Sequence, residues 1–175
     1  MPKYPFETEI TAAAAKHGLN PDLIAAFCWR ESRFKPEAYR YEPKFQRKYI
    51  DRHPNYEKLD YQTRHNLATS FGLMQVLGVT AHELGFPFLL LENLYKPECG
   101  LEYGCRKLKK LFERYGVHGS DNADLPTPNS LTDAISAYNA GTAKRGAKGG
   151  YVNNGYVVDV LMKYDKYRAQ GERQG

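Results

Sequence analysis

Residues 21–32 read Pro-Asp-Leu-Ile-Ala-Ala-Phe-Cys-Trp-Arg-Glu-Ser, and the rest of the chain is organised around this stretch. Asn20 is a good helix N-cap and proline is tolerated at a first helical position, so a helix is predicted to begin directly after Asn20. Ile24, Cys28 and Glu31 follow at i, i+4 and i+7, which places them on one face of that helix. The carboxyl group of Glu31 therefore ends a row of side chains of the kind that proteins bury.

Two effects are expected to raise the pKa of Glu31. Apolar surroundings disfavour the charged carboxylate, and the C-terminal end of the helix adds negative potential in the last turn. A glutamic acid that keeps its proton near neutral pH can act as a general acid. On spacing alone the alternative stays open that Glu31 is a solvated residue paired with Arg30 or Arg33.

Three further short blocks follow Glu31-Ser32 along the chain: Gly72-Leu73-Met74-Gln75, Ala137-Tyr138-Asn139-Ala140-Gly141, and Tyr156. In this order the four blocks resemble the catalytic domain of the soluble lytic transglycosylases, which are relatives of goose-type lysozyme. The resemblance extends over nearly the whole chain, from about Thr8 to Tyr167. It implies a mainly α, lysozyme-like fold, and the length of 175 residues fits a single domain over residues 1–175.

The resemblance also implies an activity. Lytic transglycosylases cleave the β-1,4 bond between N-acetylmuramic acid and N-acetylglucosamine in peptidoglycan without water and leave 1,6-anhydro-muramic ends. A single glutamate acts first as acid and then as base in this reaction, whereas ordinary glycosidases use a pair of carboxylates. None of the four blocks contains a second carboxylate, which agrees with the one-carboxylate reaction.

Two residues are accordingly expected to be catalytic: Glu31, as acid and base, and Tyr156, which matches the family's tyrosine near the glutamate. Glycine allows the backbone to approach a ligand closely, and the amides of Gln75 and Asn139 can both donate to and accept from an acetamido group. For these residues a tight turn, a helix cap and core packing remain open as alternatives. The expected substrate-binding residues are Ser32, Gly72, Leu73, Met74, Gln75, Tyr138, Asn139 and Ala140.

The remaining pattern predicts helices separated by irregular segments. Any sheet is expected to be a small hairpin within residues 34–66, a segment rich in proline and tyrosine. Thr80 and Ser130 are each expected to cap a helix at its N-terminus. The predicted helices span residues 7–17, 21–32, 61–67, 80–84, 97–115 and 130–138, with a last one beginning at Tyr156.

The distance from Glu31 to Gly72 is 41 positions (72 minus 31), longer than is common in the family. Tyrosines alternate with Lys and Arg in residues 39–64, which suits additional sugar subsites. The intervening segment also contains acidic residues that can supply a second carboxylate, and this makes a hydrolytic muramidase the alternative enzyme. These acidic residues are Glu37, Glu42, Asp51, Glu57 and Asp60.

The charge balance narrows the partners only a little. There are 25 Lys and Arg against 20 Asp and Glu, and the net charge of +5 suits an acidic polymer such as peptidoglycan. It suits nucleic acid equally, so a nucleic-acid-binding domain and a catalytically inactive wall-binding module remain as non-enzymatic alternatives. For the enzyme we expect peptidoglycan strands as the partner, no nucleic acid, and a monomer.

No cofactor is expected, because the five histidines and three cysteines show no metal-binding spacing. Cys28, Cys99 and Cys105 are predicted to be thiols. The sequence shows neither a signal-peptide pattern nor an apolar run of membrane-spanning length. Since the expected substrate lies in the periplasm or the extracellular cell wall, the chain is expected to be either an excised domain or a protein delivered by a phage particle or at lysis.

Overall fold

The computed structural model describes residues 2–117, 128–147 and 149–172. The described residues form a mainly helical structure with one three-stranded sheet, so the predicted fold class is confirmed. Two compact units can be distinguished, one formed by Met1–Arg30 with Cys105–Gly175 and the other by Glu31–Gly104. Each unit is described separately below, and the expectation that residues 1–175 act as a single domain stays a prediction.

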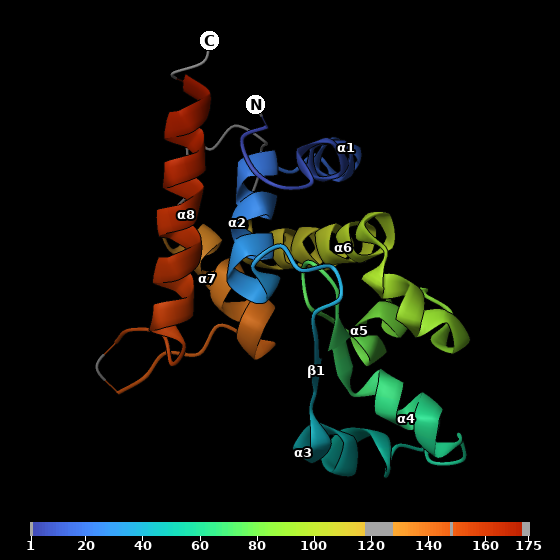
Figure 1. Cartoon of the computed structure of the whole chain (residues 1–175). Helices are drawn as coiled ribbons and strands as arrows, with labels where there is room; N and C mark the ends of the chain where they lie inside the picture. The colour runs from blue at the N-terminus through green and yellow to red at the C-terminus, as the bar shows by residue number, and fades with distance from the viewer. Residues whose placement is uncertain (1, 118–127, 148, 173–175) are drawn as a thin grey trace. The chain divides into compact units, whose positions relative to one another are not determined.

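The regular structure described for the first unit is helical, apart from a single β-bridge between Arg145 and Tyr151. Figure 1 shows α7 and α8 running close to one another in this unit. Residues 23–28 of α2 are fully buried and supply much of its core. Its helices are α1 (Glu7–His17), α2 (Pro21–Ser32) as far as Arg30, α6 (Pro97–Tyr115) from Cys105 onward, α7 (Pro128–Ala140) and α8 (Asn154–Glu172).

Local sequence signals account for the connection from α1 to α2. Gly18 ends α1 with a left-handed φ of 64°, and its N–H returns to the carbonyl groups of the last turn. The side-chain oxygen of Asn20 accepts from the backbone N–H of Asp22 at 2.9 Å and of Leu23 at 3.4 Å. Both the predicted N-cap and the predicted bounds of these two helices are confirmed.

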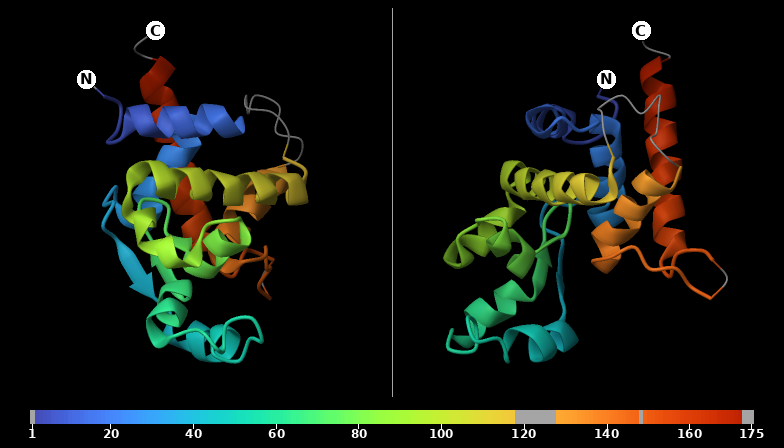
Figure 2. Two further views of the ribbon diagram at one scale, coloured as in Figure 1. Left: turned by 90° about the vertical axis from the view of Figure 1, so that its right-hand side faces the viewer. Right: turned by 180° about the vertical axis from the view of Figure 1, so that it is seen from behind.

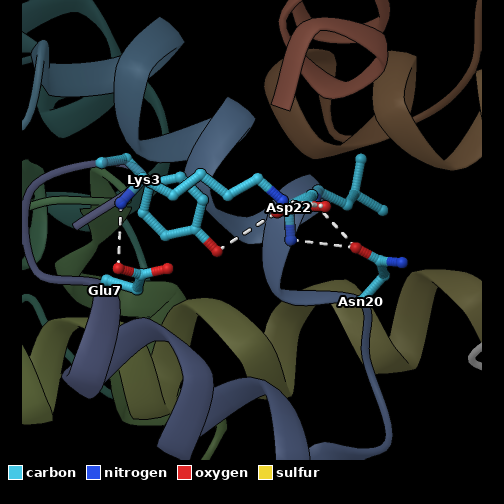
Figure 3. A network of polar contacts seen from close by, with 6 residues as sticks. Lys3, Glu7, Asn20 and Asp22 are labelled. Carbon is cyan, nitrogen blue, oxygen red and sulfur yellow. Dashed lines mark hydrogen bonds and ion pairs between the residues drawn. The ribbon is translucent and has the colours of Figure 1, made fainter. Parts of the chain in front are cut away.

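The N-terminal segment is fastened to the start of α2 by an ion pair (Figure 3). The ammonium group of Lys3 lies 2.7 and 2.8 Å from the two carboxylate oxygens of Asp22, and each side chain is only 13% exposed. The hydroxyl of Tyr4 donates to the same carboxylate at 3.3 Å, and the backbone N–H of Lys3 donates to Glu7 at 2.9 Å. Burial, reinforced by the negative charge of Asp22, raises the pKa of Tyr4.

The second unit combines short helices with the sheet (Figure 2). The strand order is β1-β2-β3 and both pairings are antiparallel, with Tyr39 opposite Phe71 and Ser70 opposite Leu77. The elements are β1 (Tyr39–Tyr41), α3 (Pro43–Phe45), the π-helix η1 (Gln46–Ile50), α4 (Tyr61–Leu67), β2 (Thr69–Phe71), β3 (Val76–Leu77), α5 (Gly78–Glu83) and the 3-10 helix η2 (Phe88–Tyr95), followed by the first residues of α6.

The predicted location of the sheet is wrong. Only β1 lies within residues 34–66, and the hairpin is instead formed by β2 and β3 around the turn at residues 72–75. These strands have two or three residues each, too few to show the alternation of polar and apolar side chains by which strands are recognised.

The two predicted caps are also wrong. The helix expected to begin at Thr80 begins at Gly78 without a side-chain cap, and the backbone of Gly78 packs against the carbonyl of Asn66, where a Cβ would approach to 2.2 Å. Ser130 is a buried residue inside α7, which begins two residues earlier and continues to Ala140.

We expect Asp22→Ala to lower the free energy of unfolding by about 2–3 kcal/mol, because it leaves the part-buried ammonium of Lys3 and the hydroxyl of Tyr4 without their acceptor. Glu42→Ala is the matched control, since it removes an acidic partner from an exposed pair, Arg40–Glu42 at 2.7 Å, and should cost less than about 1 kcal/mol. Urea unfolding of both variants measures the difference. Equal losses would show that the Lys3–Asp22 pair has no special weight.

Candidate functional site

The end of α2 is a sharp and unusual turn. Glu31 is half-buried in the last helical turn, three positions after the fully buried residues 23–28. The two residues beyond the helix, Arg33 and Phe34, both have left-handed backbone conformations, with φ of 55° and 60°. Non-glycine residues adopt this conformation at a cost of the order of 1 kcal/mol each, and such residues concentrate at functional sites. The chain therefore leaves α2 one residue after the candidate catalytic residue, at Ser32.

A buried hydrogen bond fixes this helix end to the Gly72-Leu73-Met74-Gln75 turn. The hydroxyl of Ser32 donates to the carbonyl of Leu73 at 2.8 Å across 41 positions of sequence. Ser32 is 6% exposed, so an unpaired hydroxyl there would be costly. The structure thus brings together two of the predicted blocks, Glu31-Ser32 and residues 72–75, within the second unit.

A second set of hydrogen bonds shapes the turn itself. The carbonyl of Ala38 accepts from the backbone N–H of Gly72 at 2.8 Å and from the side-chain amide of Gln75 at 2.9 Å. The same Gln75 amide donates to the carbonyl of Gly72 at 3.0 Å, and Gln75 has a left-handed φ of 48°. The donor side of the Gln75 amide is therefore engaged in holding the turn in shape.

Glycines allow other backbone segments to approach this turn closely. Gly72 has a φ of 72°, and a Cβ there would lie 2.3 Å from the carbonyl oxygen of Leu94. On α6, a Cβ on Gly100 would lie 2.7 Å from the same oxygen, and one on Gly104 would lie 2.3 Å from the sulfur of Met74. The turn is thus packed on two sides at distances that only glycine permits.

This packing bears on the predicted substrate contacts. Leu73, Met74 and Gln75 are buried, which gives all three a structural role in the second unit. Gly72 is buried as well. Their assignment, with that of Ser32, as substrate-binding residues stays a prediction.

In the first unit, Tyr138 is a buried packing residue near the end of α7. Its ring lies 4.6 Å from that of Phe27, and the ammonium of Lys107 lies 3.8 Å from the ring centre. The same ammonium donates to the Tyr138 carbonyl at 2.8 Å. Asn139 and Ala140, which follow, are exposed.

Asn153, a residue that was not predicted from the sequence, forms a hydrogen bond with the side chain of Asn139. Its amide nitrogen donates to the side-chain oxygen of Asn139 at 3.1 Å and to the carbonyl of Ser136 at 3.0 Å. Its amide oxygen accepts from the hydroxyl of Ser136 at 2.7 Å. Asn139 is exposed, and its side-chain oxygen is engaged by Asn153.

Tyr156 lies in the first turn of α8 and is buried. The guanidinium of Arg30 lies 5.0 Å from the centre of its ring and forms an ion pair with Asp159 at 2.9 Å. Arg30 is the residue before Glu31 in α2. The catalytic assignment of Tyr156, like that of Glu31, stays a prediction.

The acidic residues between Glu31 and Gly72 differ in their surroundings. Asp60 caps α4 and accepts from the hydroxyl of Thr63 at 2.6 Å and from its N–H at 2.9 Å, and these bonds hold the pKa of Asp60 below its usual value. Asp51 forms an ion pair with Arg64 at 3.5 Å, and Glu42 forms one with Arg40 at 2.7 Å. The other two, Glu37 and Glu57, are exposed.

Three properties concern cofactors, cysteines and membranes. In residues 2–117, 128–147 and 149–172 there is no group of three or more His, Cys, Asp or Glu side chains arranged to hold a metal ion. Cys28, Cys99 and Cys105 are thiols that form no disulfide in the described part of the chain, as predicted. Among the helices that the structure describes, none combines the length and the apolar character needed to span a bilayer.

The mainly helical fold, with a half-buried glutamate ending a helix over a glycine-containing turn, is that expected of a lysozyme-like domain. The family model of the transglycosylase SLT domain matches residues 8–156. The match covers most of the chain, and the protein therefore belongs to this family, which has a lytic transglycosylase-type, peptidoglycan-cleaving function. A search of curated proteins gave no match.

Gly72→Ala tests how closely the turn is packed. We expect it to destabilise the protein by at least about 2 kcal/mol more than Gly18→Ala, because the added methyl group meets the Leu94 carbonyl and cannot move away. Gly18 is the matched control: its φ of 64° is similar, but a Cβ at this position would have no neighbouring atom within 4 Å, so the variant reports the backbone penalty alone. Thermal unfolding gives both values, and similar losses would mean that the turn has room to spare.

Proposed function

We propose that this protein is a lytic transglycosylase that cleaves the bond between N-acetylmuramic acid and N-acetylglucosamine without water. In the first step Glu31 gives its proton to the bridging oxygen, and the glycosidic bond breaks. In the second step the Glu31 carboxylate takes the proton of the muramyl C6 hydroxyl, whose oxygen bonds to C1 and closes the 1,6-anhydro ring. One carboxyl group serves both steps, and no other reactant enters.

The surroundings of the acidic residues in the segment between Glu31 and Gly72 support this proposal most directly. A hydrolase that places water with a second carboxylate needs that group accessible to the substrate and weakly paired. Asp60 is occupied as a helix cap, and Asp51 and Glu42 are paired with arginines. Three of the five candidates are therefore already engaged by other residues of the segment.

The hydrolytic alternative rests on Glu37. This residue is exposed and precedes Ala38, whose carbonyl holds the turn at residues 72–75. It is therefore the candidate second carboxylate with the most direct link to the predicted site. The two reactions give products that differ by one water molecule.

In the proposed mechanism the amide N–H groups of Asn139 bind the carbonyl oxygen of an N-acetyl group, because its own oxygen is held by Asn153. Tyr156 acts with Glu31 by orienting it, in line with the family resemblance.

We further propose that the protein acts as a monomer on peptidoglycan in the periplasm or the extracellular wall.

Substituting the two glutamates by glutamine tests the assignment. Glu31→Gln should lower the rate of peptidoglycan cleavage by at least about 10²-fold, the scale expected for loss of a general acid. Glu37→Gln is the matched control, since it removes the same charge from the same segment, and it should keep the rate within about twofold. Turbidity clearing of purified peptidoglycan gives the rates, and circular dichroism checks that both variants fold.

Two results would contradict the proposal. Full activity in Glu31→Gln would remove that residue from the chemistry. A comparable loss in both variants would instead indicate a pair of carboxylates and favour the hydrolytic muramidase.

A further inference from the structure

Four cationic side chains on α3, on η1 and just beyond it surround an open hollow of about 400 Å³, which we call the cationic hollow. Its lining residues are Lys44, Arg47, Lys48 and Arg52, and all four are exposed. None of them forms an ion pair with a described residue, whereas the neighbouring acids Glu42 and Asp51 are paired with other arginines. The hollow therefore concentrates positive charge that nearby acids do not neutralise.

The backbone beneath the hollow is a π-helix. This type of helix is rare in proteins, and where it occurs it is often at a functional site. The N–H of Asp51 donates to the carbonyl of Gln46 at 2.9 Å, five residues back, and Arg47 and Arg52, which are also five residues apart, both line the hollow. The segment is held from inside by Gln46, which is buried, accepts from the hydroxyl of Tyr41 at 2.8 Å and donates to Asp51 at 3.2 Å. The cations thus stand on a fixed support.

We propose that the cationic hollow binds the phosphate groups of a polyol-phosphate polymer linked to the cell wall. Two arginines offer paired donors that match phosphate oxygens, and the two lysines add point charges. Four cations are more than one carboxylate can pair with, but they match a polymer that carries one negative charge in each repeat. That the polymer belongs to the wall rests on the proposed function.

The aromatic residue beside the hollow argues against single-stranded nucleic acid as the ligand. Such ligands need open aromatic faces on which bases stack. The ring of Tyr49 lies 4.9 Å from that of Phe45, and the ammonium of Lys48 lies 4.8 Å from its centre. Tyr49 is 49% exposed, but it is one ring that already contacts Phe45 and Lys48, whereas a nucleic-acid strand stacks successive bases on several aromatic rings. The hollow itself is lined by cations alone.

The position of the hollow fits a second binding place rather than the cleavage site. Within the second unit, α3 follows the C-terminal end of β1 (Figure 1), whereas Tyr39 at the other end of β1 pairs with Phe71, beside the turn at residues 72–75. A polymer held there would keep the enzyme on the wall without occupying the residues proposed to cleave it.

Fluorescence anisotropy with a labelled glycerol-phosphate oligomer tests the proposal. The variant K44Q/R47Q/K48Q/R52Q should bind at least about 10-fold more weakly at low salt and with a smaller salt dependence than the native chain. The charge-matched control K109Q/K110Q/R114Q/R168Q removes two lysines and two arginines from exposed positions of the first unit and should change the affinity by less than about threefold. The double variant K44Q/R52Q, which leaves η1 unchanged, should show an intermediate loss even if the fourfold variant fails to fold.

If the variant K44Q/R47Q/K48Q/R52Q and its charge-matched control weaken binding equally, the proposal is overturned, since the attraction would then depend on net charge alone. Tighter binding of a single-stranded DNA oligomer with the same number of charges would also overturn it. The rate of cleavage of phosphate-free peptidoglycan is measured in parallel and should be the same for the native chain and the variant K44Q/R47Q/K48Q/R52Q. Because binding is measured without cleavage, failure of the proposed enzymatic activity is distinguishable from failure of the hollow to bind phosphate.

Discussion

The second unit depends on the hydrogen bonds that tie the end of α2 to the turn at residues 72–75. The Ser32 hydroxyl is buried on the Leu73 carbonyl, and the Ala38 carbonyl receives both the Gly72 N–H and the Gln75 amide. Buried polar groups must be paired, so these bonds allow few other arrangements of the turn. They define where the helix ends and where β2 turns into β3, and hence the surroundings of Glu31.

Backbone strain is concentrated at the same place. Among the described residues, four non-glycine residues have a left-handed φ, and three of them, Arg33, Phe34 and Gln75, flank this contact. Gly72, Gly100 and Gly104 allow approaches that a Cβ would block. A protein retains such conformations when the surrounding structure over-determines them, and this is the pattern expected for a site whose geometry matters more than its local stability.

The sequence predicted what local chemistry determines. The end of α1 and the start of α2 follow from Gly18, Asn20 and the proline after it. Helical spacing predicted one buried stripe on α2, whereas residues 23–28 are buried on every side because other elements surround the helix. It did not predict what depends on distant contacts: the strands are too short to show a pattern, and α5 begins without a side-chain cap, at a glycine that packs against Asn66. Two features of the sequence could have pointed to further parts of the site. Gly100 and Gly104 are four residues apart on α6, a spacing that indicates close packing on one helix face, and Asn153 forms a hydrogen bond with the predicted Asn139.

The long segment between the first two blocks separates its charges by role. Its acidic residues act largely as a cap and as ion-pair partners, while a group of its cations is left facing an open hollow. On this account the segment supports the fold and contacts the wall, and the chemistry is left to one carboxyl group.

Digestion of peptidoglycan in water enriched in heavy oxygen, followed by mass spectrometry, tests most directly whether cleavage by one carboxyl group proceeds without water. The account predicts new muramic ends that contain no heavy oxygen and lack the mass of one water, whereas heavy oxygen at those ends would contradict it.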